Sequence, residues 1–108
     1  MEPSVLDKPF PAYSDLAPSI LSQIDRGDYA LLEAEGLICP EPVMLLHKLV
    51  KQLASESLIK VTADDDSTLR DIPRFCDFLR HTLLAVDTRP ADGQSESRIH
   101  TYWISTRA

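Results

Sequence analysis

The chain has 108 residues, of which 44% are hydrophobic and 26% charged, which suits one domain with a modest core and argues against wholesale disorder. The net charge of -6 works against non-specific binding to nucleic acid or to an anionic membrane. Two cysteines and the lack of an apolar run approaching about 18 residues disfavour a disulfide scaffold and a membrane span.

The N-terminal part, residues 1–27, contains four prolines and scattered apolar side chains, which predicts a flexible extension before a domain at 28–108. It lacks the basic segment and apolar core of a secretory signal, so we expect the reducing cytoplasm. Residues 19–24 fit a short helix, and packing of this helix against the domain is the less favoured of its two interpretations.

Hydrophobic periodicity predicts a first long helix over residues 40–53, with an apolar stripe at spacings of three and four. A second helix is predicted to begin near Asp71, because Pro73 fits only a first helical turn, and its apolar face is expected to extend to Leu83. The expected strands are 29–34, 58–63, 84–88 and 98–105, and the polar stretch 89–97 is predicted to be a mobile loop.

This order of elements, βαβαββ, predicts an α+β fold. Two helices that each have one apolar stripe are best accommodated on one face of a four-stranded mixed sheet, which gives a two-layer α/β sandwich. A right-handed crossover makes the first two strands parallel.

Cys39 lies where the first strand region ends and the first long helix begins, and Pro40 and Pro42 mark that beginning. The positive end of a helix dipole stabilises a thiolate, so we expect an exposed thiol with a lowered pKa and regard Cys39 as a candidate nucleophile. The alternative is a small buried hydrophobe, as cysteines often are.

The chain resembles the TusA family of small sulfur carriers, also called SirA-like, in three segments. These are Gly-Leu-Ile-Cys-Pro-Glu-Pro-Val at 36–43, Ala-Asp-Asp-Asp at 63–66 and Arg-Asp-Ile-Pro-Arg-Phe-Cys at 70–76. The resemblance implies that Cys39 accepts sulfane sulfur as a persulfide from a cysteine desulfurase or another donor and passes it to an acceptor protein. Family routes include 2-thiouridine synthesis in tRNA, molybdenum cofactor assembly and sulfur metabolism, and no cofactor is implied.

Partner selectivity is then expected from side chains around Cys39. Several have ordinary alternatives: Glu41 can simply complement the helix dipole, Met44 can fill the core, and Lys48 and Arg70 can be solvated or ion-paired surface charges. His47 stands where the family commonly has arginine, which removes a fixed positive charge. The candidate partner-binding residues are Glu41, Met44, His47, Lys48, Asp65, Arg70 and Phe75.

Cys76 falls on the apolar stripe of the second helix, so a buried structural thiol is favoured over a resolving cysteine. A zinc site is disfavoured because no short paired spacing of ligands is present. We expect a monomer that binds its partner proteins and neither nucleic acid nor membrane directly. The competing functional hypothesis is a non-enzymatic redox-sensing or regulatory interaction module.

Overall fold

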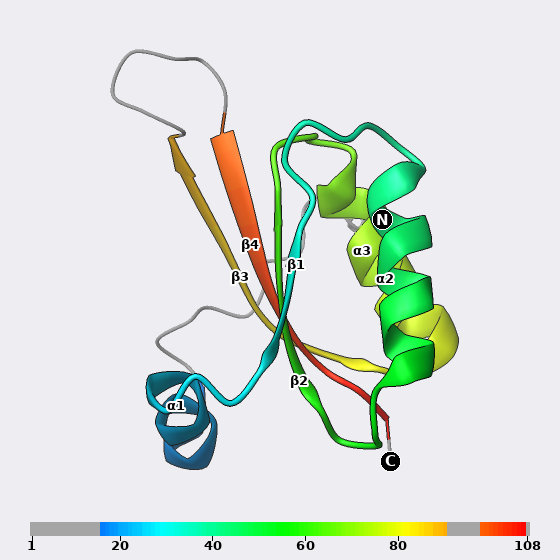
Figure 1. Ribbon diagram of the computed structural model, residues 1–108. Coiled ribbons are helices and arrows are strands. Elements are labelled where there is room, and N and C mark those ends of the chain that lie inside the picture. The colour runs from blue at the N-terminus through cyan, green and yellow to red at the C-terminus, as the bar shows by residue number, and fades with distance from the viewer. Residues whose placement is uncertain (1–15, 91–97, 108) are drawn as a thin grey trace, which may run out of the picture.

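The computed structural model describes residues 16–90 and 98–107 of the chain. A four-stranded mixed sheet has two helices, α2 and α3, against one face and a short helix, α1, near the other (Figure 1). The predicted α+β class, with its mixed sheet and two helices on one face, is confirmed. The elements are α1 (Pro18–Asp25), β1 (Ala30–Glu33), α2 (Glu41–Gln52), β2 (Leu58–Ala63), α3 (Thr68–Leu79), β3 (Thr82–Pro90) and β4 (Arg98–Ser105).

The strand order is β1-β2-β4-β3, and the predicted parallel pairing of β1 with β2 is confirmed by the register Ala30↔Ile59. Strand β4 is antiparallel to both of its neighbours. Parallel strands end at the same edge of a sheet, so the loops that follow β1 and β2 lie side by side there (Figure 1). This edge carries the site described below.

The main core lies between the sheet and helices α2 and α3. Side chains alternate across a strand, so Ile59 and Val61 of β2 face the same layer as Tyr102 and Ile104 of β4. These residues hold both long helices in place. Buried members of this core are Leu46, Ile59, Val61, Ile72, Phe75, Cys76, Tyr102 and Ile104.

The opposite face of the sheet has a smaller core around Trp103, which is 4% exposed. Ile20 and Ile24 of α1 pack against this cluster, and the Tyr29 ring meets the Trp103 ring edge-on with centroids 5.0 Å apart. The short helix expected at 19–24 is therefore present as α1, and it packs against the sheet.

Helix α3 begins three residues earlier than predicted, at Thr68, and Pro73 lies inside it. Because proline has no N–H, the helix lacks the hydrogen bond that residue 73 would otherwise donate to the Leu69 carbonyl. The preceding turn is still closed by other hydrogen bonds, such as the one from Asp71 N to Ser67 O at 2.9 Å. The helix also ends earlier than its apolar stripe suggested. Arg80 adopts the left-handed conformation (φ 64°), and Leu83 therefore belongs to β3.

Strand β3 is longer than predicted and includes residues 89 and 90 of the expected loop. The rest of that loop, 91–97, and residues 1–15 of the expected extension lie outside the described residues.

Candidate functional site: an exposed cysteine between two acidic residues

The loop after β1 turns back across the end of the sheet at Gly36. Gly36 has φ +83°, a conformation that side-chain-bearing residues rarely adopt, and its N–H donates to Asp64 Oδ1 at 3.0 Å. The turn therefore needs a glycine for its backbone, and it fixes the segment that leads to Cys39 against the loop that follows β2.

Helix α2 begins immediately after Cys39. Pro40 is its N-cap residue, the Glu41 N–H donates to the Ile38 carbonyl at 2.9 Å, and the Met44 N–H donates to the Pro40 carbonyl at 3.0 Å. The Cys39–Pro40 peptide bond is cis. Cys39 thus stands just outside the first helical turn, where its side chain is exposed as predicted.

Asp65 holds the backbone of Cys39. Its Oδ2 accepts the Cys39 N–H at 2.8 Å, and its Oδ1 accepts the Ser67 N–H at 3.1 Å. The hydrogen bonds from Ser67 and Cys39 hold the pKa of this carboxyl below its usual value. The bond to Cys39 joins the loops that follow β1 and β2.

Asp71, on the first turns of α3, contacts the sulfur itself. The Cys39 thiol donates to Asp71 Oδ2 at 3.0 Å, and Arg70 Nε donates to Asp71 Oδ1 at 3.0 Å. This hydrogen bond to Asp71 raises the pKa of Cys39 above its ordinary value, and desolvation and the Asp71 charge add smaller contributions. The same hydrogen bond lowers the pKa of Asp71. The prediction of a lowered thiol pKa was therefore wrong, because a carboxylate at hydrogen-bond distance stabilises the protonated thiol.

A groove of about 600 Å³ opens beside the thiol between α2 and α3. Phe75 forms part of its buried wall, while Phe78 is 85% exposed at its rim. An apolar groove next to a reactive atom can receive an apolar side chain of another molecule. Its lining residues are Cys39, Pro40, Val43, Asp71, Arg74, Phe75, Asp77 and Phe78.

The structure brings some of the predicted partner-binding residues to this site and leaves others further along α2. Asp65 binds the Cys39 backbone, Phe75 lines the groove and Arg70 reaches the thiol only through Asp71. The exposed His47 ring meets Phe75 edge-on at 5.9 Å. Of the remaining three on α2, Met44 is 60% exposed, and Glu41 and Lys48 are also exposed.

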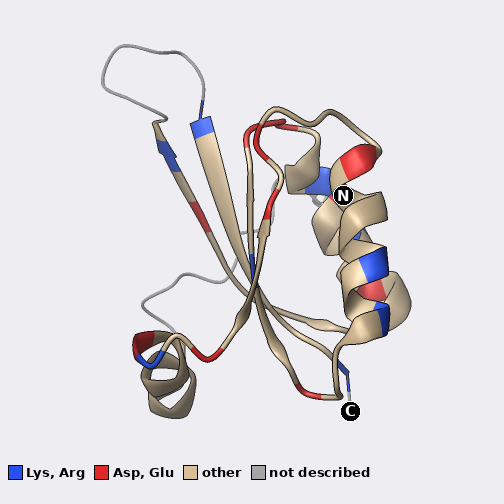
Figure 2. Ribbon diagram, in the orientation of Figure 1, with Lys and Arg blue, Asp and Glu red and all other residues tan. Residues whose placement is uncertain are grey.

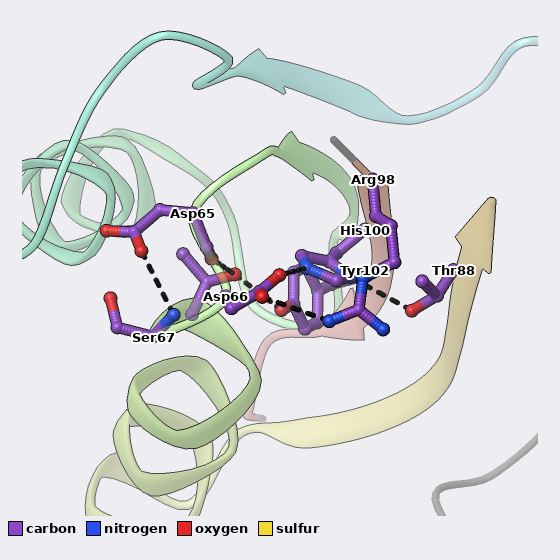
Figure 3. A network of polar contacts seen from close by, with 8 residues as sticks. Asp65, Asp66, Ser67, Thr88, Arg98, His100 and Tyr102 are labelled. Carbon is purple, nitrogen blue, oxygen red and sulfur yellow. Dashed lines mark hydrogen bonds and ion pairs between the residues drawn. The ribbon is translucent and has the colours of Figure 1, made fainter. Parts of the chain in front are cut away.

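The acidic loop after β2 is anchored on its other side by β4 (Figure 3). Asp66 Oδ1 lies 2.8 Å from Nε2 of the fully buried His100, and Arg98 donates to Asp66 Oδ2 at 3.0 Å. Contacts with His100 and Arg98 lower the pKa of Asp66. Figure 2 shows how acidic residues gather at this end of the sheet.

Cys76 is 2% exposed in the main core, and burial raises the pKa of its thiol to about 12, in keeping with a structural role. Across residues 16–90 and 98–107, no group of three or more His, Cys, Asp or Glu side chains is placed to hold a metal ion.

Two residues of the site, Asp71 and Phe78, were not singled out from the sequence. Asp71 belongs to the Arg-Asp-Ile-Pro segment that carries the family resemblance, but only the packing of α3 beside α2 places it at the sulfur. Phe78 falls outside the helical stripe of Ile72, Cys76 and Leu79, and an aromatic side chain off that stripe is the signal that could have identified it.

The fold and the site together define a small two-layer α/β protein that presents one exposed cysteine at the start of a helix. Residues 30–100 match the family model described as Sulfurtransferase TusA. Proteins named Sulfur carrier protein TusA from Pseudomonas putida and Pseudomonas entomophila are each 51% identical over 79 residues, which cover 73% of this chain and 90% of the relative. One of the same name from Pseudomonas aeruginosa is 49% identical over 79 residues, covering 73% of this chain and 91% of the relative. The chain belongs to the TusA family.

None of the helices in the described part of the chain is long and apolar enough to span a membrane.

Proposed function

We propose that this protein is a sulfur carrier that accepts sulfane sulfur on Cys39 as a persulfide and relays it to an acceptor protein. The observation that carries the proposal is the exposed thiol beside an apolar groove, inside the segment that matches the family. Relatives with about half of their aligned residues identical bear the name sulfur carrier, which supports the same role here.

The chemistry requires one sulfur atom and access to it. Cys39 Sγ attacks the outer sulfur of a donor persulfide, the donor S–S bond breaks, and the donor sulfur leaves with the proton that Cys39 gives up. The thiol must lose its proton during this attack, so the contact with Asp71 has to be released when the donor is bound. An acceptor thiol then attacks the Cys39 persulfide in the same way.

The donor is a cysteine desulfurase or another persulfide-bearing protein, and the groove with Phe78 at its rim is where that partner docks. Glu41, Met44, His47, Lys48, Asp65, Arg70 and Phe75 are proposed to contribute to partner binding or to support it. A downstream acceptor would serve tRNA thiolation, molybdenum cofactor assembly or sulfur metabolism. Because Cys39 exchanges sulfur only with other molecules that dock on it, the protein acts as a sulfurtransferase in a relay.

Intact-mass spectrometry after incubation with a cysteine desulfurase and cysteine tests this function. A gain of about 32 Da per sulfur, reversed by reductant, is expected for the wild type and absent in Cys39→Ser, while Cys76→Ser loads normally. Loading that persists in Cys39→Ser, or a folded wild type that fails to load even from glutathione persulfide, would contradict the proposal.

The competing redox-sensing function is less well supported by the site. Peroxide reacts with the thiolate, and a sensor cysteine therefore usually has a lowered pKa. The bond to Asp71 raises the pKa of Cys39, which disfavours a thiolate that peroxide could attack in the absence of a docked partner.

A further inference from the structure

Ser67 stands at the N-cap of α3 without making the bond expected of it there. A serine at this position commonly accepts a hydrogen bond from the N–H two or three residues later, but Ser67 makes no side-chain capping bond. Its Oγ is buried and has no hydrogen-bond partner among the residues that the structure describes. A buried hydroxyl without a partner costs free energy, so another role for this group is called for.

Ser67 is a neighbour of Cys39, because the backbone N–H groups of the two residues donate to the two oxygens of the Asp65 carboxylate, at 3.1 and 2.8 Å. It acts on the thiol in the direction opposite to Asp71, because it favours an anionic sulfur whereas Asp71 favours the protonated one. The empty thiol therefore has an acceptor, Asp71 Oδ2 at 3.0 Å, while the hydroxyl of the neighbouring Ser67 makes no hydrogen bond within the described part of the chain.

We propose that Asp71 and Ser67 are a pair of positioning residues that distinguish the empty from the loaded state of Cys39. This inference rests on the proposed carrier function. In the empty state, Asp71 accepts the hydrogen of the Cys39 thiol. In the loaded state, the Ser67 hydroxyl donates to the anionic persulfide of Cys39. A persulfide is more acidic than the parent thiol and is anionic near neutral pH, so it offers Asp71 no hydrogen and is repelled by the carboxylate.

The charges around the sulfur are compatible with this division. Arg70 binds the far oxygen of Asp71 and weakly favours an anionic sulfur, and Arg74 also lowers the pKa of Asp71. Asp65 is engaged by backbone N–H groups. Other ionisable groups near the sulfur are Glu41 at the start of α2, Asp77 in the groove, and Asp64 and Asp66 on the loop after β2.

The consequence is an equilibrium that two single residues shift in opposite directions. In the exchange of Cys39 thiol with glutathione persulfide, the S–S bond of glutathione persulfide breaks and a new one forms at Sγ. The Cys39 proton ends on the glutathione sulfur, and no oxidant is needed. Asp71 stabilises the empty side of this exchange and Ser67 the loaded side.

The test measures the loaded fraction by intact mass at a fixed ratio of glutathione persulfide to glutathione, at pH 7. We expect Asp71→Asn to raise the loaded fraction several-fold and Ser67→Ala to lower it. Asp28→Asn is the control for the loss of one carboxylate charge, because Asp28 is exposed and lies outside the groove; its loaded fraction should equal that of the wild type.

A second measurement needs no sulfur donor. The pH profile of Cys39 alkylation by iodoacetamide should shift to lower pH in Asp71→Asn and to higher pH in Ser67→Ala, relative to the wild type and Asp28→Asn. Ser67→Ala removes no capping bond and is expected to keep the fold, which leaves one informative variant even if Asp71→Asn is unstable.

Two results would overturn the pairing and leave the carrier function standing. In the first, the wild type loads normally and both Asp71→Asn and Ser67→Ala load to the same fraction. In the second, both variants shift the loaded fraction in the same direction. A wild type that does not load under any persulfide concentration would reject the carrier function, and the inference with it.

Discussion

The backbone N–H of Cys39 donates to Asp65 Oδ2 at 2.8 Å, although the two residues are 26 positions apart in the sequence. The bond exists because β1 and β2 are parallel neighbours, whose following loops meet at one edge of the sheet. The position of the reactive sulfur therefore depends on the acidic loop after β2 as well as on α2.

Replacing Asp65 by alanine should slow persulfide loading roughly three- to tenfold, since small displacements of a reacting atom have large kinetic effects. Stability should fall by about 1 kcal/mol or less, because the carboxylate is close to solvent. Asp65→Asn keeps an acceptor oxygen and should lie between alanine and wild type. Loading rates by mass spectrometry check this, with the exposed Asp28→Ala as the charge control; equal rates in Asp65→Ala and Asp28→Ala would contradict it.

Acidification should weaken the fold through the carboxylates of the site. The pKa values of Asp65, Asp66 and Asp71 are lowered in the folded protein, so the unfolded chain takes up protons first as the pH falls. Their contribution to stability is fully present above about pH 4 and is lost as the pH drops through the folded-state values.

Urea denaturation at pH 7, 4 and 3 measures this dependence. Asp66→Asn, which removes one of these titrations, should already be less stable at pH 7 and should lose less on going to pH 3 than the wild type does. An identical loss in both proteins would show that the contacts of Asp66 with His100 and Arg98 do not contribute.

Cys76 should be silent in sulfur transfer and important for stability. Its thiol is buried with a pKa of about 12, so in native protein only one of the two cysteines, Cys39, should react with a thiol reagent. Cys76→Ser should load sulfur like the wild type and lose about 1–3 kcal/mol of unfolding free energy, because a hydroxyl replaces an apolar group in the core. Two reactive thiols in the native state would contradict this assignment.

The fold could be predicted from the sequence because local patterns determine most of it. The two strands at 58–63 and 98–105 have exactly the predicted limits, and the apolar stripe of α2 predicted its packing face. The errors lie where local conformation depends on single residues. Helix α3 continues through Pro73 and stops at the left-handed Arg80, and neither event follows from periodicity.

The site was predictable in its main residue and not in its electrostatics. Cys39 and its exposure follow from the segment around it, whereas the effect of Asp71 on the thiol depends on a contact 32 positions away. Helix-dipole reasoning considers the helix on which the cysteine lies, and here the deciding group is on the neighbouring helix.

Partner docking through the groove can be separated from the chemistry at Cys39. Phe78→Ser should reduce loading from a cysteine desulfurase several-fold and leave loading from glutathione persulfide unchanged, because only the protein donor is large enough to need the exposed ring. Leu31→Ser is the matched control: Leu31 is 52% exposed but lies on β1, outside the residues that line the groove. Equal loss with both donors would instead indicate a change in the site itself.

Removal of residues 1–27 tests whether residues 28–108 are the sulfur-carrier domain. Deleting α1 and Leu16 uncovers the face of the sheet around Trp103, so the truncated protein should lose about 3–5 kcal/mol of stability, for the buried Leu16 and the half-buried Ile20, Leu21 and Ile24. The fluorescence of Trp103, the single tryptophan of the chain, should shift to longer wavelength as water reaches it. Loading of Cys39 should be unchanged, because the contacts that hold Cys39 come from the loop after β2 and from α3, not from α1. Loss of loading in a truncated protein that remains folded would make the extension part of the carrier domain.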